Sequence, residues 1–156
     1  TRRSSDLMYE ADRISLLEFN TANMSKSQEK EYKNIQKEIA LNKYVIDNKS
    51  KAFALHIIRL CAQLNDEKHG YLLSKQLLRS GTSIGANVRE RLNAQSKADF
   101  ISKLQIALKE ADETAYWLEL LVESDIIDQK QFTPIYRELK EIIAIITASI
   151  NTLKNN

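Results

Sequence analysis

The sequence is poor in the residues that end helices and build turns. Its 156 residues include three glycines and one proline. β-Sandwiches and barrels need many turns, which depend on glycine and proline, so this scarcity argues against all-β folds and favours a few long helices. The single cysteine, Cys61, excludes an intramolecular disulfide framework and fits a reducing, cytoplasmic compartment. No apolar run reaches the ~18 residues of a membrane span, so we expect no membrane partner.

Histidine is also scarce, which removes the metal sites that helical bundles can hold. A di-iron site requires Glu-x-x-His on two helices, but Phe53 and Asp66 stand three residues before His56 and His69. Zinc sites fail for want of cysteine and histidine, and no phosphate-binding loop or dinucleotide fingerprint is present. The carboxylates of residues 110–123 spread around the solvent side of a helix. We therefore predict no metal, no cofactor and no enzymatic activity.

Apolar residues at helical spacing dominate residues 45–156. Four helices are predicted, from Asp47 or Asn48 to about Leu64, from about Tyr71 to Ala94, from about Lys97 to Glu123, and from a start near Gln129 to Pro134, with the proline in the first turn, to about Leu153. Their apolar faces recur every three or four residues: Phe53, Ile57, Leu60 and Leu64; Leu73, Leu77, Ile84 and Val88; Ile101, Leu104, Leu108, Ala111, Ala115, Leu118 and Val122; and Phe132, Ile135, Leu139, Ile142, Ile143, Ile146 and Ile150. A capping box at Ser96 and Asp99 starts the third helix. The pattern predicts an all-α, antiparallel up-down-up-down four-helix bundle.

Residues 1–44 are predicted to be an N-terminal extension of this bundle domain. Residues 27–43 are helix-prone, with Ser27 as a cap and a thin apolar stripe at Tyr32, Ile35 and Ile39. Residues 1–23 lack a clear period, and Met24 resembles a natural start. We interpret residues 1–23 as a leader or a segment added in cloning, and no secretory signal is apparent in them.

Small residues cluster in the second predicted helix. Gly81 and Gly85 lie four positions apart, and a glycine inside a helix costs ~1 kcal/mol relative to alanine. Such positions are expected where another backbone approaches closely. With Ser83 and Asn87, the two glycines form a candidate helix-packing or oligomer interface.

Charge is distributed unevenly between the second and third helices. Residues 70–95 hold four basic residues and one acidic residue, a net +3, whereas residues 96–124 hold three basic and six acidic residues, a net −3. Opposite charges on neighbouring helices can attract each other within the bundle or between subunits. Alternatively, the basic helix can contact phosphates. The candidate nucleic-acid-binding residues are Lys75, Arg79, Arg89, Arg91 and Lys97.

Several motifs in this region resemble those of a known family. They are SKQLLR at 74–79, SIGANVRE at 83–90, AQSKADF at 94–100, IALKE at 106–110 and ETAYWL at 113–118. Over about residues 45–153 the chain is similar to bacterial four-helix bundle proteins encoded in ribosomal-RNA intervening sequences. The accessory variability protein of diversity-generating retroelements is related to that family.

The resemblance implies a cytoplasmic, non-enzymatic homo-oligomer, a pentamer in this family, that associates with RNA or a ribonucleoprotein. The retroelement branch binds nucleic acid and a reverse transcriptase, which implies DNA or a nucleic-acid-processing protein as further partners. The alternative is a protein-interaction scaffold or accessory subunit with no direct nucleic-acid contact. In that case the helix around Gly85 would be a subunit or partner interface.

Overall fold

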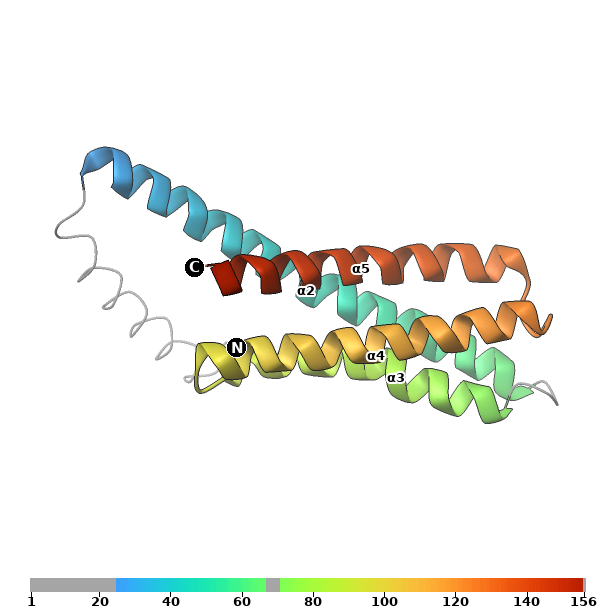
Figure 1. Cartoon of the computed structure of the whole chain (residues 1–156). Helices are drawn as coiled ribbons and strands as arrows, with labels where there is room; N and C mark the ends of the chain where they lie inside the picture. The colour runs from blue at the N-terminus through green and yellow to red at the C-terminus, as the bar shows by residue number, and fades with distance from the viewer. Residues whose placement is uncertain (1–24, 67–70, 156) are drawn as a thin grey trace, which may run out of the picture. The chain divides into compact units, whose positions relative to one another are not determined.

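A computed structural model of the protein describes residues 25–66 and 71–155, without the side chains of residues 31, 32, 34–43 and 66. In order, the elements are α2 (Lys26–Asp66), α3 (Tyr71–Glu90), the 3-10 helix η1 (Arg91–Asn93), α4 (Lys97–Glu123) and α5 (Gln129–Asn155) (Figure 1). No strand occurs within these ranges, so the prediction of an all-α protein is confirmed. The proposed leader at residues 1–23 and the stripe at Tyr32, Ile35 and Ile39 lie outside the described positions and side chains.

The chain forms two compact units, Thr1–Leu41 and Asn42–Asn156. Within the first unit, Ser25 rather than the predicted Ser27 caps α2. The Ser25 Oγ accepts a hydrogen bond from the Gln28 backbone N–H at 3.3 Å, and the Gln28 side chain accepts one from the Ser25 N–H at 3.0 Å. This reciprocal pair is a capping box. One turn later, Lys33 and Glu29 form an ion pair at 2.6 Å.

The predicted helix start at Asp47 or Asn48 is wrong, because α2 continues through both residues. No glycine or proline occurs between Lys26 and Asp66, so nothing in the covalent chain interrupts the helix. Asp47 was expected to cap a helix, but its carboxylate instead accepts a hydrogen bond from Arg91 at 2.7 Å.

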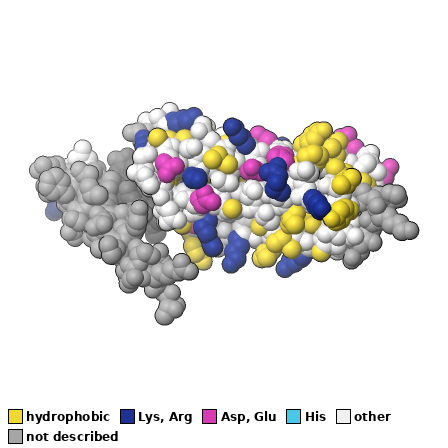
Figure 2. Space-filling view, turned by 90° about the horizontal axis from the view of Figure 1, so that it is seen from below, with side chains coloured by type: hydrophobic (Ala, Val, Ile, Leu, Met, Phe, Trp, Pro, Cys, Tyr) yellow, Lys and Arg dark blue, Asp and Glu magenta, His cyan; other side chains and the backbone are white. Residues whose placement is uncertain are grey.

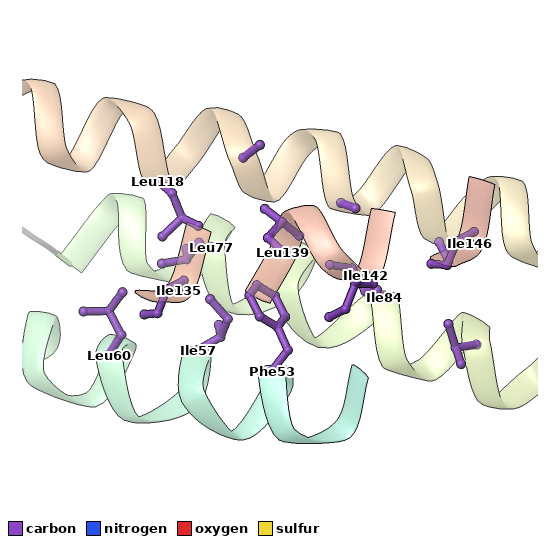
Figure 3. Packing of buried hydrophobic residues seen from close by; sticks show 14 of the residues in the cluster. Phe53, Ile57, Leu60, Leu77, Ile84, Leu118, Ile135, Leu139, Ile142 and Ile146 are labelled. Carbon is purple, nitrogen blue, oxygen red and sulfur yellow. The ribbon is translucent and has the colours of Figure 1, made fainter. Parts of the chain in front are cut away.

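The second unit has a hydrophobic core to which all four of its α-helices contribute. Figure 3 shows Phe53, Ile57 and Leu60 of α2, Leu77 and Ile84 of α3, Leu118 of α4 and four α5 residues converging on it. The predicted face of α4 is rotated, since the fully buried Ala107 and Leu121 were omitted while Ile101, Leu108 and Val122 are only partly buried. Alanines in α4 leave room for the large side chains of the neighbouring helices.

Polar contacts define how the helices of this unit pair. Asn65 Oδ1 of α2 accepts a hydrogen bond from the Ser74 hydroxyl of α3 at 2.6 Å, and the backbone of Ser50 lies against Gly85. Thr114 of α4 donates to the Ser80 hydroxyl of α3 at 3.0 Å, and both side chains are fully buried. As residue numbers rise along one helix of each pair, they fall along the other. α3 and α4 lie side by side (Figure 1).

Local signals set the ends of α4 and α5. The Ser96 Oγ accepts a hydrogen bond from the Asp99 N–H at 3.1 Å, which confirms the predicted cap, although the Asp99 carboxylate bonds the Gln95 N–H rather than that of Ser96. Asp128 and Gln131 form a second capping box that was not predicted. It starts α5 at Gln129, so Pro134 lies in the second turn of the helix rather than the first.

None of the described helices combines the length and apolar character needed to span a membrane.

Candidate nucleic-acid interface

The structure separates the five predicted phosphate-binding cations into different environments. Lys75, Arg89 and Lys97 are exposed. Arg79 is half exposed but occupied by carboxylates, and Arg91 is buried. The five residues therefore do not form a single basic surface.

Arg91 is tied into the protein interior and is not presented to solvent. It is 3% exposed, its guanidinium donates to Asp47 at 2.7 Å and to the Val88 carbonyl, and it lies 5.8 Å from the centre of the Phe100 ring. Sequence reasoning placed it with the surface cations because the charges of residues 70–95 were counted together. On a helix, two residues amount to about 200°, so the two side chains point in nearly opposite directions.

Arg79 joins α3 to α4. Its guanidinium forms ion pairs with Glu113 and, at 3.4 Å, with Glu110. The hydrogen bond to Glu113 raises the pKa of Arg79. The hydrogen bonds from Arg79 and then from the Trp117 indole N–H, at 3.0 Å, lower the pKa of Glu113. Glu113 thus joins the Trp117 indole of α4 to Arg79 of α3.

A second ion pair links the same helices near η1. Lys103 of α4 lies 2.7 Å from Glu90 of α3, and this hydrogen bond raises the pKa of Lys103. With the pairs of Arg79, it supports the structural interpretation of the opposite charges on α3 and α4. Acidic and basic residues of α3 and α4 thus neutralise one another across the contact between the two helices.

Three exposed cations lie on the surface shared by α2 and α3, which we call the α2–α3 face. The exposed Lys97 is not one of them, because it begins α4. The α2–α3 face presents Lys51 and Arg89, which line the groove between the two helices, and Lys75, which helical spacing places two turns before the groove residue Thr82. None of the three cations has a carboxylate partner among the residues that the structure describes. The nearby carboxylates of Asp47 and Glu90 are neutralised by Arg91 and Lys103. This face therefore carries a surplus of positive charge.

Lys51 is absent from the predicted set because it lies on a different helix from the other basic residues. Its place follows from the pairing of α2 with α3, in which Ser50 lies against Gly85. The small residues Ser50 and Gly85 were the available signal, since they allow close approach of two helices and so bring Lys51 beside Arg89.

The candidate small-residue interface lies against α2. A Cβ atom on Gly81 would stand 2.9 Å from Ile57 Cγ1, and one on Gly85 would stand 3.3 Å from the Ser50 carbonyl oxygen. Ser83 and Asn87 are half-buried and bond within α3, Ser83 to the Arg79 carbonyl at 2.7 Å and Asn87 to the Ser83 carbonyl at 2.9 Å. Gly81 and Gly85 thus pack two helices of one chain, and their role in assembly stays a prediction.

The described part of the chain offers little acid–base or metal chemistry. Within it, no group of three histidine, cysteine or carboxylate side chains is arranged to hold a metal ion. His56 Nδ1 lies 3.2 Å from both carboxylate oxygens of Glu138, an inter-helix contact at the protein surface. Cys61 is buried and donates its S–H to the Ser74 carbonyl at 3.3 Å, and burial raises the pKa of the thiol to about 11.

The geometry defines a small all-α protein with a basic face and an internal network of ion pairs. Residues 42–148 match the family model described as 23S rRNA-intervening sequence protein, so the chain belongs to that family. The predicted resemblance to this family is confirmed, whereas the relation to retroelement proteins stays a prediction. No curated protein matches the chain.

A solved structure is also similar. It is a crystal structure of a protein of unknown function from the S23 ribosomal protein family of Bacteroides thetaiotaomicron. The two sequences are 48% identical, the TM-score is 0.69, and the match covers 70% of this chain and 98% of that chain.

Proposed function

We propose that this protein is a non-enzymatic, cytoplasmic, homo-oligomeric bundle protein that associates with RNA or a ribonucleoprotein through its α2–α3 face. In this proposal, residues 45–156 form an antiparallel up-down-up-down four-helix bundle, residues 1–44 extend it, and the assembly is a pentamer. The family description and the likeness to an S23 ribosomal protein family member support an RNA-related role. The pentamer rests on the family resemblance.

The observation that carries the RNA proposal is the surplus positive charge of the α2–α3 face. Lys51, Lys75 and Arg89 have no carboxylate partner in the described ranges, whereas four other cations of the second unit do: Lys49, Arg79, Arg91 and Lys103. Cations that neutralise phosphates release counterions, so binding weakens as salt rises. Tyr71, with Lys75 4.3 Å from the centre of its ring, adds an exposed aromatic side chain to the same face.

The test compares two triple variants that lose the same number of positive charges. Lys51→Gln, Lys75→Gln and Arg89→Gln alter the α2–α3 face, whereas Lys130→Gln, Arg137→Gln and Lys154→Gln alter exposed positions on α5. RNA affinity is measured by fluorescence anisotropy between about 50 and 300 mM KCl. Each phosphate that a cation neutralises on a single strand adds about 0.7 to the slope of log K against log salt. We expect the first set to reduce this slope by about two units and the second set to leave it nearly unchanged.

Undetectable RNA binding at low salt would refute the proposal, and equal losses in both triple variants would refute the assignment to this face. Light scattering on a sizing column gives the subunit number in the same experiment. The mass of a monomer would refute the proposed homo-oligomer.

A protein-interaction scaffold or accessory subunit is the second candidate function. Nine large hydrophobic side chains are exposed in the described ranges, and all lie on α2, α3, η1 or α4: Tyr44, Leu55, Ile58, Tyr71, Leu72, Leu78, Leu92, Ile106 and Tyr116. Figure 2 shows hydrophobic side chains gathered beside Lys and Arg side chains on the face it presents. Exposed apolar surface of this kind suits a protein partner, such as a second copy or a nucleic-acid-processing protein.

A further inference from the structure

A groove of about 300 Å³ lies between α2 and α3. Its walls are built mainly from small or apolar residues, among them Ala54 of α2, Ala86 of α3 and Leu92 of η1. Gly85 also lines it, where a Cβ atom would stand 3.3 Å from the Ser50 carbonyl oxygen. The two helices therefore approach closely at the floor of the groove, where Gly85 meets Ser50. The short side chains of Ala54 and Ala86 leave a recess over this floor.

Two cations flank this recess from opposite helices. Lys51 on α2 and Arg89 on α3 are both exposed and line the groove, and no described carboxylate pairs with either one. Asp47 also lines the groove, but its carboxylate accepts a hydrogen bond from Arg91 at 2.7 Å and is neutralised. The groove thus combines an apolar interior with two positive charges at its edge.

This combination matches the chemistry of a single nucleotide. A nucleobase is flat and largely apolar on its faces, and its phosphates are anionic and lie at the periphery. In a duplex the faces of the bases are stacked against one another, and only base edges, 2′-hydroxyls and phosphates are exposed to a protein. An unstacked base of a single strand can enter a recess between two helices.

We propose that the α2–α3 groove receives one unstacked nucleotide of a single-stranded RNA, with its base against Ala54, Ala86 and Leu92 and its phosphates at Lys51 and Arg89. Tyr44 lies on the same side of α2 as Asp47 and Lys51, three and seven residues before them, and is 68% exposed. Its ring offers a stacking surface for an adjacent base. This inference rests on the proposed RNA association and adds the form of RNA that is bound.

The test fills the groove without changing its charge. Ala86 is exposed, so Ala86→Leu adds a large side chain over the recess and introduces no clash in the core. Ala144→Leu makes the same substitution at an exposed position of α5 and serves as the matched control. Both variants and the parent protein are titrated with a labelled single-stranded RNA of about twelve nucleotides and with its duplex.

We expect Ala86→Leu to weaken single-strand binding by about tenfold, because the leucine side chain takes the place of the base in the recess, while duplex binding changes little. Ala144→Leu should match the parent protein for both RNAs. Single-strand binding by Ala86→Leu equal to that of the parent would overturn the inference. A changed oligomer mass for Ala86→Leu alone would also overturn it, because a second copy would then occupy the groove.

Failure of this inference can be told from failure of the proposed function. If neither RNA binds the parent protein at low salt, the RNA association itself is wrong. If both bind the parent and Ala86→Leu changes neither affinity, the RNA association stands and the groove is not the site.

Discussion

Arg89 and Arg91 are two residues apart, yet the structure predicts opposite consequences when each is replaced by methionine. Arg91→Met removes a guanidinium that is 3% exposed and donates to Asp47 and to the Val88 carbonyl. Methionine keeps most of the apolar stem, so the loss is mainly electrostatic. Arg89→Met removes an exposed cation that has no carboxylate partner in the described part of the chain.

The stability lost in Arg91→Met depends on the Asp47 carboxylate and the Val88 carbonyl, which lose their hydrogen-bond donor. Breaking a fully buried ion pair by removing one partner costs about 3–5 kcal/mol. The Asp47 side chain is 33% exposed, so water replaces part of the lost interaction. We expect a loss of about 2 kcal/mol in the free energy of unfolding, in the range of one hydrogen bond to a charged group. Arg89→Met should change stability by about 0.5 kcal/mol or less.

Urea denaturation followed by far-UV circular dichroism measures both stability changes, and fluorescence anisotropy measures RNA affinity. Arg91→Met should lower stability and leave the RNA affinity of the folded protein unchanged. Arg89→Met should lower the RNA affinity and leave stability nearly unchanged. Adding Asp47→Asn to Arg91→Met should cost little more, because the two side chains act as a pair. The reasoning is refuted if Arg91→Met weakens RNA binding without loss of stability.

Three further predictions concern stability and reactivity. Gly81→Ala should lower the free energy of unfolding by about 1 kcal/mol, because the new Cβ would stand 2.9 Å from Cγ1 of the fully buried Ile57. This loss outweighs the better helix propensity of alanine. Urea denaturation that shows a more stable protein would contradict this packing. Cys61, with its pKa raised to about 11, should react with a thiol reagent at pH 8 only as fast as the protein unfolds, and immediate labelling of the native protein would show that the thiol is accessible. The hydrogen bond from Arg79 lowers the pKa of Glu113 from 4.5, so the stability that the Glu113 carboxylate contributes is present at neutral pH and is lost as pH falls through the lowered pKa. In thermal melts, Glu113→Gln should therefore be less stable than the parent protein at neutral pH, and this difference in stability should shrink in acid. A deficit that grew toward low pH would reverse that sign.

The helices of the second unit could be predicted from the sequence because local signals define them. Lys97–Glu123 was predicted with both ends correct, since Ser96 supplies a side-chain cap and apolar residues repeat without interruption. The start of α5 near Gln129 was predicted without its capping box at Asp128. The continuity of α2 was missed because Asp47 is a favoured capping residue, although no glycine or proline interrupts the helix and the Asp47 carboxylate bonds Arg91 instead.

The candidate interface was less predictable, because it depends on which charges neutralise one another. The net +3 of residues 70–95 included Arg79 and Arg91 equally with Arg89, although Glu113 and Asp47 occupy the first two. Ion pairing between residues 44 positions apart cannot be inferred from the charges along one helix. Lys51 was overlooked for the same reason, since it belongs to a different helix from the cations beside it.

The buried hydroxyl pair of Ser80 and Thr114 has a consequence for the register between α3 and α4. Aliphatic side chains repeated every three or four residues pack almost equally well if one helix slides past the other by a turn, because hydrophobic contact is non-directional. The bond of 3.0 Å between these two hydroxyls forms in one alignment only, and a slide would forfeit about 1 kcal/mol and place a hydroxyl against apolar neighbours. Two small polar residues thus give a uniform apolar surface a single preferred alignment, and with it a fixed pairing of Arg79 with Glu113 and of Lys103 with Glu90.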